Sequence, residues 1–172
     1  KNVGVSKELV LDGKQIGSYT CTNEINGTKR TPQPTGIGTF VHEFGHVLGL
    51  TDHYDSSATS TAEAFHPGAY DTMATGSYNN DGNTPPTFSA FERASLGWLN
   101  YDELTTSSAD LQTLPNLQES NKAYRVSVNG TMGKEFFVLE NRQQKGWDAF
   151  LPGHGMLMWH IDYDENAWKN NE

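Results

Sequence analysis

Residues 35–55 read TGIGTFVHEFGHVLGLTDHYD and contain the pattern H-E-x-x-H. The pattern continues to Gly49 and Asp52, so that the whole run reads H-E-x-x-H-x-x-G-x-x-D. The apolar residues of the run recur at the spacing of one helix face, which is formed by Ile37, Phe40, Val41, Phe44 and Leu48. This stretch therefore predicts an amphipathic helix. Gly49, which readily adopts the left-handed conformation, is expected to end it.

The two histidines of the pattern are placed to bind one metal ion. His42 and His46 are one helical turn apart, so their side chains project from the helix side by side. A glycine inside a helix costs about 1 kcal/mol relative to alanine. Gly45 therefore indicates that some group approaches the helix backbone closely.

A third ligand is expected from the turn after the helix, because a catalytic zinc ion usually has three protein ligands. The candidates are Asp52, His53 and Asp55. Asp52 is favoured, because metzincins of this spacing place their third ligand at that position. Adjacent residues in an extended turn point in opposite directions, so His53 is expected to face away from the metal.

Glu43 lies beside the two histidines and is the expected catalytic residue. Zinc accepts imidazole and carboxylate ligands, and a catalytic site keeps one position for water, whose pKa falls from 15.7 to about 7. Glu43 cannot easily be a ligand together with both of its neighbours, so it is free to act as general base. The alternative is an ordinary amphipathic helix with two exposed histidines. It is disfavoured because Glu43, Gly49 and Asp52 all fall where a metal site needs them.

Composition excludes several classes of partner. The chain has 172 residues, with 12 basic and 21 acidic residues and a net charge of −9, which argues against nucleic acid or an anionic membrane surface. No apolar run approaches the roughly 20 residues of a membrane span. Cys21 is the only cysteine, so an internal disulfide is impossible, and we expect a small buried hydrophobe, with an exposed thiol as the alternative. The low charge and loop-rich composition suit a secreted protein.

The segment before the metal helix is expected to contain short strands and turns. Turns are predicted at Asp12–Gly13 and Asn26–Gly27, a strand at Ile16–Cys21, and a loop at Pro32–Pro34. A zinc peptidase usually needs a sheet and a supporting helix before this motif. The short lead-in therefore predicts a partial domain.

Two further features follow the motif. Met73 lies about twenty residues after the third ligand, which is typical of the methionine turn beneath the zinc in metzincins. The alternative is a core methionine that fills a gap. A second helix is predicted at residues 88–97, where Ser89 and Glu92 form a capping box and Gly97 is expected to end the helix.

The C-terminal part is expected to be rich in strands. Tyr124–Val128 and Glu135–Glu140 flank a loop at Asn129–Gly130 and predict a hairpin, and Gly155–Tyr163 predicts a third strand. Asp162–Asn166 and Asn79–Asn83 have alternating oxygen ligands that suit calcium. Neither matches the full twelve-residue calcium loop, so solvated turns are the preferred interpretation.

Four blocks of the sequence together resemble the immune inhibitor A family of secreted bacterial metallopeptidases. They read HEFGHVLGLTDHYD, AYDTMATGSY, FSAFERASLGWL and KEFFVLENRQQKGWDAFLPGHGMLMWHID. The resemblance implies a zincin-type catalytic domain, an extracellular location and hydrolysis of peptide bonds. It matches His42, His46 and Asp52 to the zinc ligands, Glu43 to the catalytic glutamate and Met73 to the methionine turn. Catalytic domains of that family begin well before Lys1, so the resemblance also implies further domains or chain.

These observations predict that residues 1–172 form one partial domain with an α+β, metzincin-like fold. Residues 1–52 are expected to end an N-terminal subdomain with the active-site helix. Residues 53–172 are expected to form a C-terminal subdomain with the methionine turn, the helix at 88–97 and a β-rich tail.

The expected function is zinc-dependent hydrolysis of protein or peptide substrates, with Tyr78 or Tyr70 as candidates for stabilising the oxyanion. The alternatives are a non-catalytic, zinc-stabilised module that binds proteins or glycans, and an enzyme that acts on a non-peptide amide. Glu43 argues against the module, because a purely structural zinc site does not need a general base.

Overall fold

The computed structural model describes residues 2–3, 9–17, 19–54, 66–105 and 114–170. It has an α+β fold, as the sequence predicted. The helices are α1 (Ile37–Leu48), α2 (Ala90–Ser95), α3 (Leu117–Ser120) and α4 (Glu165–Asn170), and the 3-10 turns are η1 (Gly68–Tyr70), η2 (Thr75–Tyr78) and η4 (Gly146–Asp148).

The described strands form one larger sheet and three two-stranded pairs. The larger sheet has the order β10-β9-β8-β7, with β7 parallel to β8 and the other pairs antiparallel. Its strands are β7 (Asp102–Glu103), β8 (Tyr124–Ser127), β9 (Glu135–Arg142) and β10 (Gly155–Asp162). The two-stranded pairs are β1 (Asn2–Val3) with β4 (Tyr19–Thr20), β2 (Leu9–Leu11) with β3 (Lys14–Ile16), and β5 (Ile25–Thr28) with β6 (Thr31–Pro34).

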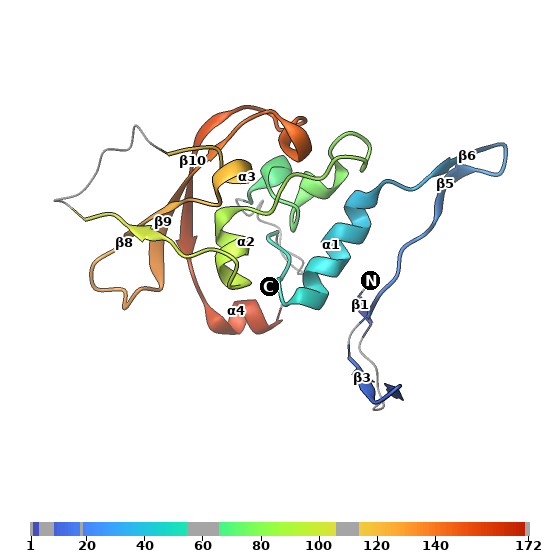
Figure 1. Ribbon diagram of the computed structural model, residues 1–172, viewed down its shortest axis with the longest axis horizontal. Helices are drawn as coiled ribbons and strands as arrows, with labels where there is room; N and C mark the ends of the chain where they lie inside the picture. The colour runs from blue at the N-terminus through green and yellow to red at the C-terminus, as the bar shows by residue number, and fades with distance from the viewer. Residues whose placement is uncertain (1, 4–8, 18, 55–65, 106–113, 171–172) are drawn as a thin grey trace, which may run out of the picture.

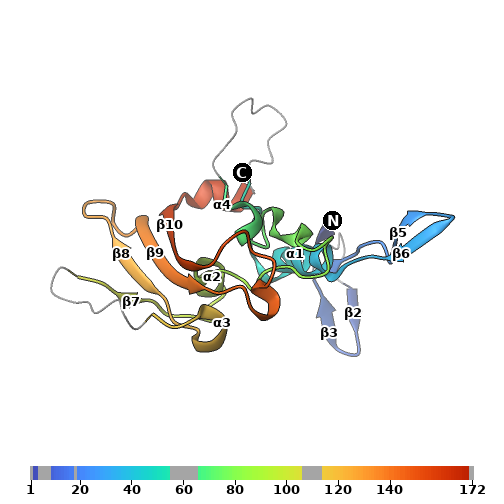
Figure 2. The same cartoon turned by 90° about the horizontal axis from the view of Figure 1, so that it is seen from above.

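The elements are arranged around α1. Figures 1 and 2 show the four-stranded sheet on one side, α2 between this sheet and α1, and the pairs β2–β3 and β5–β6 projecting on the other side. None of the described helices is long and apolar enough to cross a membrane.

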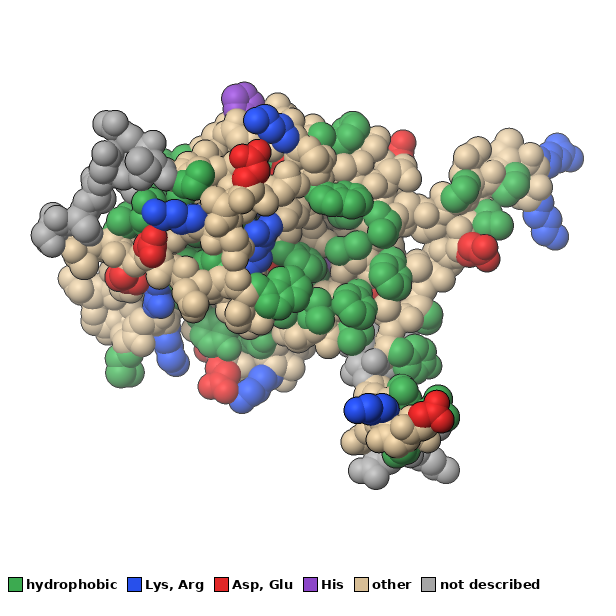
Figure 3. All heavy atoms as spheres, viewed as in Figure 1, with side chains coloured by type: hydrophobic (Ala, Val, Ile, Leu, Met, Phe, Trp, Pro, Cys, Tyr) green, Lys and Arg blue, Asp and Glu red, His purple; other side chains and the backbone are tan. Residues whose placement is uncertain are grey.

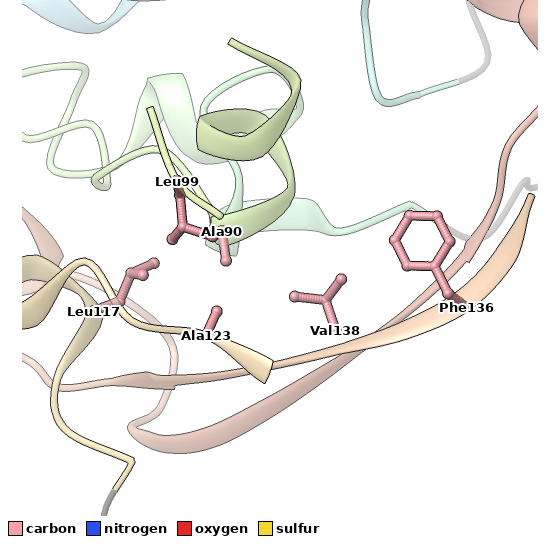
Figure 4. Packing of buried hydrophobic residues seen from close by; sticks show 6 residues of the cluster. All are labelled: Ala90, Leu99, Leu117, Ala123, Phe136 and Val138. Carbon is pink, nitrogen blue, oxygen red and sulfur yellow. The ribbon is translucent and has the colours of Figure 1, made fainter. Parts of the chain in front are cut away.

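The hydrophobic core lies between α2 and the inner face of the sheet. Figure 4 shows its buried members, which are Ala90, Leu99, Leu117, Ala123, Phe136 and Val138. On β10, Trp159 and Ile161 pack against the same cluster, as the alternation of apolar residues in this strand predicted. The core therefore fixes α2 on the sheet.

A buried ionic network joins the sheet to the start of α2. The guanidinium of Arg142 lies 3.0 Å from Glu140 Oε1 and 2.7 Å from Asp148 Oδ1, and all three side chains are fully buried. The other oxygen of Glu140 accepts the backbone N–H of Ala90 at 2.6 Å, and Arg142 also donates to the carbonyl of Thr87 at 3.0 Å. These bonds satisfy charges whose burial would otherwise be costly.

The predictions for the C-terminal part are largely confirmed. The hairpin is formed by β8 and β9, and the third strand is β10. The capping box is present, since Ser89 accepts the N–H of Glu92 and Glu92 accepts the N–H of Ser89. The helix is shorter than the predicted 88–97, because α2 ends at Ser95 and Gly97 has already turned into the left-handed region with φ 73°.

In the N-terminal part, the predicted turn at Asp12–Gly13 is confirmed and joins β2 to β3. Two other predictions were wrong. Asn26–Gly27 is not a turn, because both residues lie in β5 and pair with β6. Pro32–Pro34 is accordingly not a loop but part of β6. Proline is tolerated there because β6 has only one neighbouring strand.

The predicted strand at Ile16–Cys21 is interrupted. Strand β3 ends at Ile16, and β4 comprises only Tyr19–Thr20 and pairs with β1. Cys21 is exposed, so the expectation of a buried cysteine was wrong. The short strands of this segment form isolated pairs that bury little, which explains why an apolar residue there does not become part of a core.

The apolar face of α1 is uncovered by the described part of the chain. Ile37, Phe40, Phe44 and Leu48 keep 46%, 44%, 43% and 37% of their surface exposed. The rings of Phe40 and Phe44 stack on each other with centroids 6.0 Å apart. Figure 3 shows hydrophobic side chains gathered on the face that carries α1 and α2.

Another side of α1 packs closely on residues 73–82, and two glycines allow this. A Cβ on Gly38 would lie 1.8 Å from the carbonyl oxygen of Ser77, and the N–H of Gly38 donates to Gly82 O at 2.7 Å. A Cβ on Gly45 would lie 2.5 Å from the sulfur of Met73. The close approach that Gly45 predicted is therefore made by a methionine.

Replacing Gly38 by alanine tests this packing. Gly38→Ala should lower the free energy of unfolding by about 1–3 kcal/mol, the usual cost of overpacking, because a backbone carbonyl blocks the new methyl group. Gly17→Ala is the matched control, since nothing lies within 4 Å of a Cβ at Gly17. Urea denaturation of both variants measures the effect. Equal stability of Gly38→Ala and Gly17→Ala would contradict the packing described here.

Candidate metal centre

The donor atoms of His42, His46 and Asp52 converge on one point. The Nε2 atoms of His42 and His46 lie 3.1 Å and 3.4 Å from Asp52 Oδ1. All three donor atoms lie within 4.8 Å of one another. A tetrahedral ion with bonds of about 2.0–2.1 Å separates its ligand atoms by about 3.3–3.4 Å. The three side chains are thus spaced as the ligands of a single metal ion would be.

The sharp end of α1 brings Asp52 back towards the histidines. Gly49 ends the helix with φ 109°, and its N–H donates to His46 O at 3.1 Å. The N–H of Leu50 donates to Gly45 O at 3.0 Å, which completes the hydrogen bonding of the helix end. Leu50 is buried, so the chain is anchored immediately before residues 51–54. These residues carry Asp52 and are called the ligand turn below. The predicted role of Gly49 as the helix stop is confirmed.

Backbone carbonyls orient both imidazole rings. His42 Nδ1 lies 2.9 Å from Thr72 O, and His46 Nδ1 lies 3.0 Å from Leu50 O. Each carbonyl can only accept, so each Nδ1 carries the proton and Nε2 keeps its lone pair. Both histidines therefore present the nitrogen that a metal requires, with a fixed ring orientation.

The charges of the centre favour a cation. The hydrogen bond to Asp52 raises the pKa of His46 against the effect of burial, and the negative charge of Glu43 contributes to the same rise. A site that attracts a proton in this way also attracts a metal ion, which competes with the proton for the same nitrogen. Glu43 is half-buried and sits one residue from His42, which places a carboxylate beside the donor atoms without making it one of them.

Tyr54 belongs to the centre and was missed by the sequence analysis. Burial raises the pKa of Tyr54 to about 12, and the negative charge and hydrogen bond of Asp52 add to the rise, followed by Tyr78 and Glu43. A signal was present, because residues two apart in an extended turn point the same way, so Tyr54 shares the direction of Asp52. The hydroxyl of Tyr70, by contrast, lies 3.0 Å from the position of a Cβ on Gly153.

His53, which lies between Asp52 and Tyr54 in the sequence, points away from the candidate centre. The sequence predicted that His53 faces away from the metal, and its Nδ1 lies 2.9 Å from Asp71 Oδ2. His53, Asp71 and Glu92 form a second cluster whose donor atoms lie within 4.8 Å of one another. Asp55, the remaining ligand candidate, lies outside the described residues.

Charge compensation stabilises this second cluster. Burial alone would lower the pKa of His53, but the charge and hydrogen bond of Asp71 outweigh it and raise the pKa to about 9. Burial raises the pKa of Glu92, and the charge of Asp71 adds to this effect. At neutral pH, His53 therefore carries a positive charge that compensates the buried carboxylate of Asp71.

Met73 lies directly beneath the metal helix. It is fully buried, and its sulfur contacts the helix at Gly45. Its backbone N–H donates to Asp71 Oδ1 at 2.7 Å, and its carbonyl accepts the N–H of His53 at 2.9 Å. Met73 therefore contacts both the helix that carries the histidines and the turn that carries Asp52.

The two stretches considered for calcium form ordinary turns. Asp164 Oδ1 accepts the N–H groups of Asn166 and Ala167 at 2.7 Å and 2.9 Å, and so caps α4. In the other stretch, the side-chain amide of Asn80 donates a hydrogen bond to Thr84 Oγ1 at 2.9 Å. The described residues give no support to a calcium site at either place.

A pocket of about 610 Å³ adjoins the candidate centre. One wall is the ligand turn, which includes Asp52 and His53, and aromatic side chains such as Trp159 and Trp168 line the pocket as well. Asp52 is shared by the pocket and the candidate centre. His42, Glu43 and His46 do not line the pocket, so it lies on the His53 side of the turn.

Comparisons with known proteins agree with this geometry. The family model for the immune inhibitor A peptidase M6 catalytic domain matches residues 9–99, which include every donor of the candidate centre. The pre-pro-metalloprotease PrtV of Vibrio cholerae serotype O1, from strains M66-2 and ATCC 39315 / El Tor Inaba N16961, is 39% identical over 83 residues. That alignment covers 43% of this chain and only 9% of PrtV, so the chain spans a small part of these relatives.

No solved structure gives a significant match. The matched family model extends over more than half of the sequence. By this match, the chain belongs to the immune inhibitor A peptidase M6 catalytic-domain family.

Proposed function

We propose that the chain is the catalytic part of a secreted, zinc-dependent endopeptidase. His42, His46 and Asp52 hold the zinc ion, and Glu43 is the general base. The observation that carries the proposal is the convergence of three donor atoms within 4.8 Å beside a half-buried glutamate. Family membership supports the hydrolysis of peptide bonds as the reaction.

The donor set fits zinc in a catalytic role. Two imidazoles and one carboxylate are a common catalytic set, and three protein ligands leave a fourth position for water. A zinc ion bound there lowers the pKa of that water and polarises the scissile carbonyl. A structural zinc site would instead be closed by a fourth protein ligand. Among the histidines, cysteines and carboxylates that the structure describes, only His42, His46 and Asp52 converge at this point.

In the proposed reaction, Glu43 transfers a proton and Tyr54 stabilises the negative charge of the oxyanion. Glu43 accepts a proton from the attacking water and delivers it to the leaving amine. Tyr54, a phenol that is protonated at neutral pH, donates a hydrogen bond to the developing oxyanion. Tyr54 is preferred to Tyr78, which is 68% exposed, and to Tyr70, whose hydroxyl lies beside Gly153.

The wider organisation of the molecule belongs to the same proposal. Residues 1–52 end an N-terminal subdomain, and residues 53–172 form the C-terminal subdomain of a metzincin-like fold, with Met73 as its methionine turn. The position of Met73 beneath Gly45 supports this assignment. PrtV is named a pre-pro-metalloprotease and is far longer than the region that it shares with this chain. As part of this proposal, the chain acts outside the cell on protein or peptide substrates and belongs to a polypeptide with further domains.

Replacing the general base tests the chemistry. Glu43→Gln should lower the rate of casein hydrolysis by at least about 100-fold, because general-base catalysis contributes that much or more. Zinc content should stay at one ion per chain, since Glu43 is not a ligand. Glu119→Gln, an exposed change of the same kind, is the control. Near-normal proteolysis by Glu43→Gln would show that Glu43 is not the base.

Removing the third donor tests the metal site itself. Asp52→Ala should weaken zinc binding by more than the roughly 10–100-fold that follows loss of a residue that only supports a ligand. Asp102→Ala, at an exposed aspartate, should leave the affinity unchanged. Competition with a chromogenic chelator measures both dissociation constants. Unaltered affinity in Asp52→Ala would exclude Asp52 as a ligand.

The role of Tyr54 is separable from metal binding. Tyr54→Phe should lower kcat by about 100-fold or more, as loss of one oxyanion donor does, while zinc stays bound. Tyr78→Phe is the matched variant and should lower kcat much less. Steady-state kinetics on a fluorogenic peptide compares the two. A larger loss in Tyr78→Phe than in Tyr54→Phe would reverse the assignment.

A further inference from the structure

Asp71 is the centre of a hydrogen-bonded support behind the ligand turn. Its side chain is 3% exposed, and each carboxylate oxygen has its own donor. Oδ1 accepts the backbone N–H of Met73 at 2.7 Å, and Oδ2 accepts Nδ1–H of His53 at 2.9 Å. One carboxylate therefore ties the ligand turn to the methionine segment.

His53 is held at its backbone as well as at its ring. Its N–H donates to Met73 O at 2.9 Å. Its ring packs against Phe91 and Trp168, with centroids 5.7 Å and 6.2 Å away. Because His53 is next to Asp52 in an extended turn, fixing His53 on one side directs Asp52 to the other side, where His42 and His46 lie.

Glu92 closes the support from α2. Its side chain is fully buried, and its Oε2 accepts the N–H of Ser89. Its Oε1 and His53 Nε2 are buried without a hydrogen-bond partner in the described structure. His53 thus shares one buried cluster with the acidic side chains of Asp71 and Glu92, and its Nδ1 is committed to Asp71.

We propose that His53 is a positioning residue for the metal centre and acts through its hydrogen bond to Asp71. The inference rests on the proposed metal site. The turn that carries Asp52 lies outside helices and strands, so an unsupported Asp52 would lose conformational entropy when it binds metal. Holding the turn in its binding conformation beforehand removes part of that cost and raises the affinity.

The test compares two substitutions of His53 that differ in one hydrogen bond. His53→Leu removes the donor to Asp71 and keeps an apolar side chain against Phe91 and Trp168. In His53→Asn, the amide nitrogen can occupy the place of Nδ1 and donate to Asp71. His160→Leu is the control, because His160 lines the same pocket and bonds only Glu135 in the described structure, at 3.0 Å.

The zinc dissociation constant is measured by competition with a chelator, and the visible spectrum of the cobalt-substituted protein reports the ligand geometry. His53→Leu should weaken zinc binding by about 10–100-fold, the usual effect of removing a residue that supports a ligand. His53→Asn should recover most of the affinity and the wild-type cobalt spectrum. His160→Leu should match the wild type in both measurements.

Three results would overturn the inference. The first is wild-type affinity in His53→Leu, and the second is an equal loss in His53→Leu and His53→Asn, which would indicate packing alone. The third is binding of two zinc ions per wild-type chain with loss of one in His53→Leu, because His53 would then be a ligand of a second site. If His53→Leu does not fold, His53→Phe replaces it, since it also lacks the donor to Asp71 and keeps an aromatic ring against Phe91 and Trp168.

These outcomes are distinguishable from failure of the proposed function. A wild-type chain that binds no zinc and cleaves no casein would contradict the proposed function, and the inference with it. A wild-type chain that binds one zinc ion and cleaves casein, with His53→Leu unchanged in affinity, would contradict the inference alone.

Discussion

The candidate metal centre depends on the hydrogen bonds that one three-residue segment, Asp71–Met73, makes to two other parts of the chain. Thr72 O fixes the ring of His42 on the metal helix, at 2.9 Å from Nδ1. Met73 O and the Asp71 carboxylate hold His53 and hence the turn that carries Asp52. One of the two donors on the helix and the donor on the turn are thereby positioned by the same segment, while the ring of His46 is oriented by Leu50 O. An error of about 1 Å in that segment would separate the donor atoms beyond the reach of a single ion.

The C-terminal sheet supports this segment through a chain of buried polar contacts. Thr72 Oγ1 donates to Pro86 O at 2.8 Å, and the next residue, Thr87, donates its N–H to Asp148 Oδ1 at 2.9 Å. Asp148 is paired with Arg142 of β9 in the fully buried ionic network. The function of the β-rich half, in this account, is to hold the loop that in turn holds the ligands. This explains why the network contains charged groups in full burial, where only complete pairing makes them tolerable.

Local patterns predicted the parts of the structure that depend on local interactions. The helix α1, its stop at Gly49 and the capping box of Ser89 could be predicted, because each is set by residues three or four apart. The hairpin of β8 and β9 and the strand β10 followed from alternation of apolar residues. The prediction of a turn at Asn26–Gly27 was wrong, because these residues pair with β6 in spite of their strong local preference for a turn.

Contacts between distant residues left no signal in the sequence. The bond of His42 to Thr72 joins residues 30 positions apart, and the bond of Thr87 to Asp148 joins residues 61 apart. The pairing of His53 with Asp71 is of the same kind. Tyr54 is different, because alternation in the turn was enough to place it beside Asp52, and the prediction used that argument only for His53. The exposure of Cys21 follows from the lack of a core around the N-terminal strand pairs.

We propose above that His42, His46 and Asp52 bind one zinc ion. Anomalous diffraction from crystals of the zinc-loaded protein, collected on both sides of the zinc absorption edge, tests it most directly. The account predicts one zinc peak per chain, about 2.0–2.2 Å from Nε2 of both histidines and from a carboxylate oxygen of Asp52. A peak among His53, Asp71 and Glu92 instead, or no peak between the two helix histidines, would contradict it.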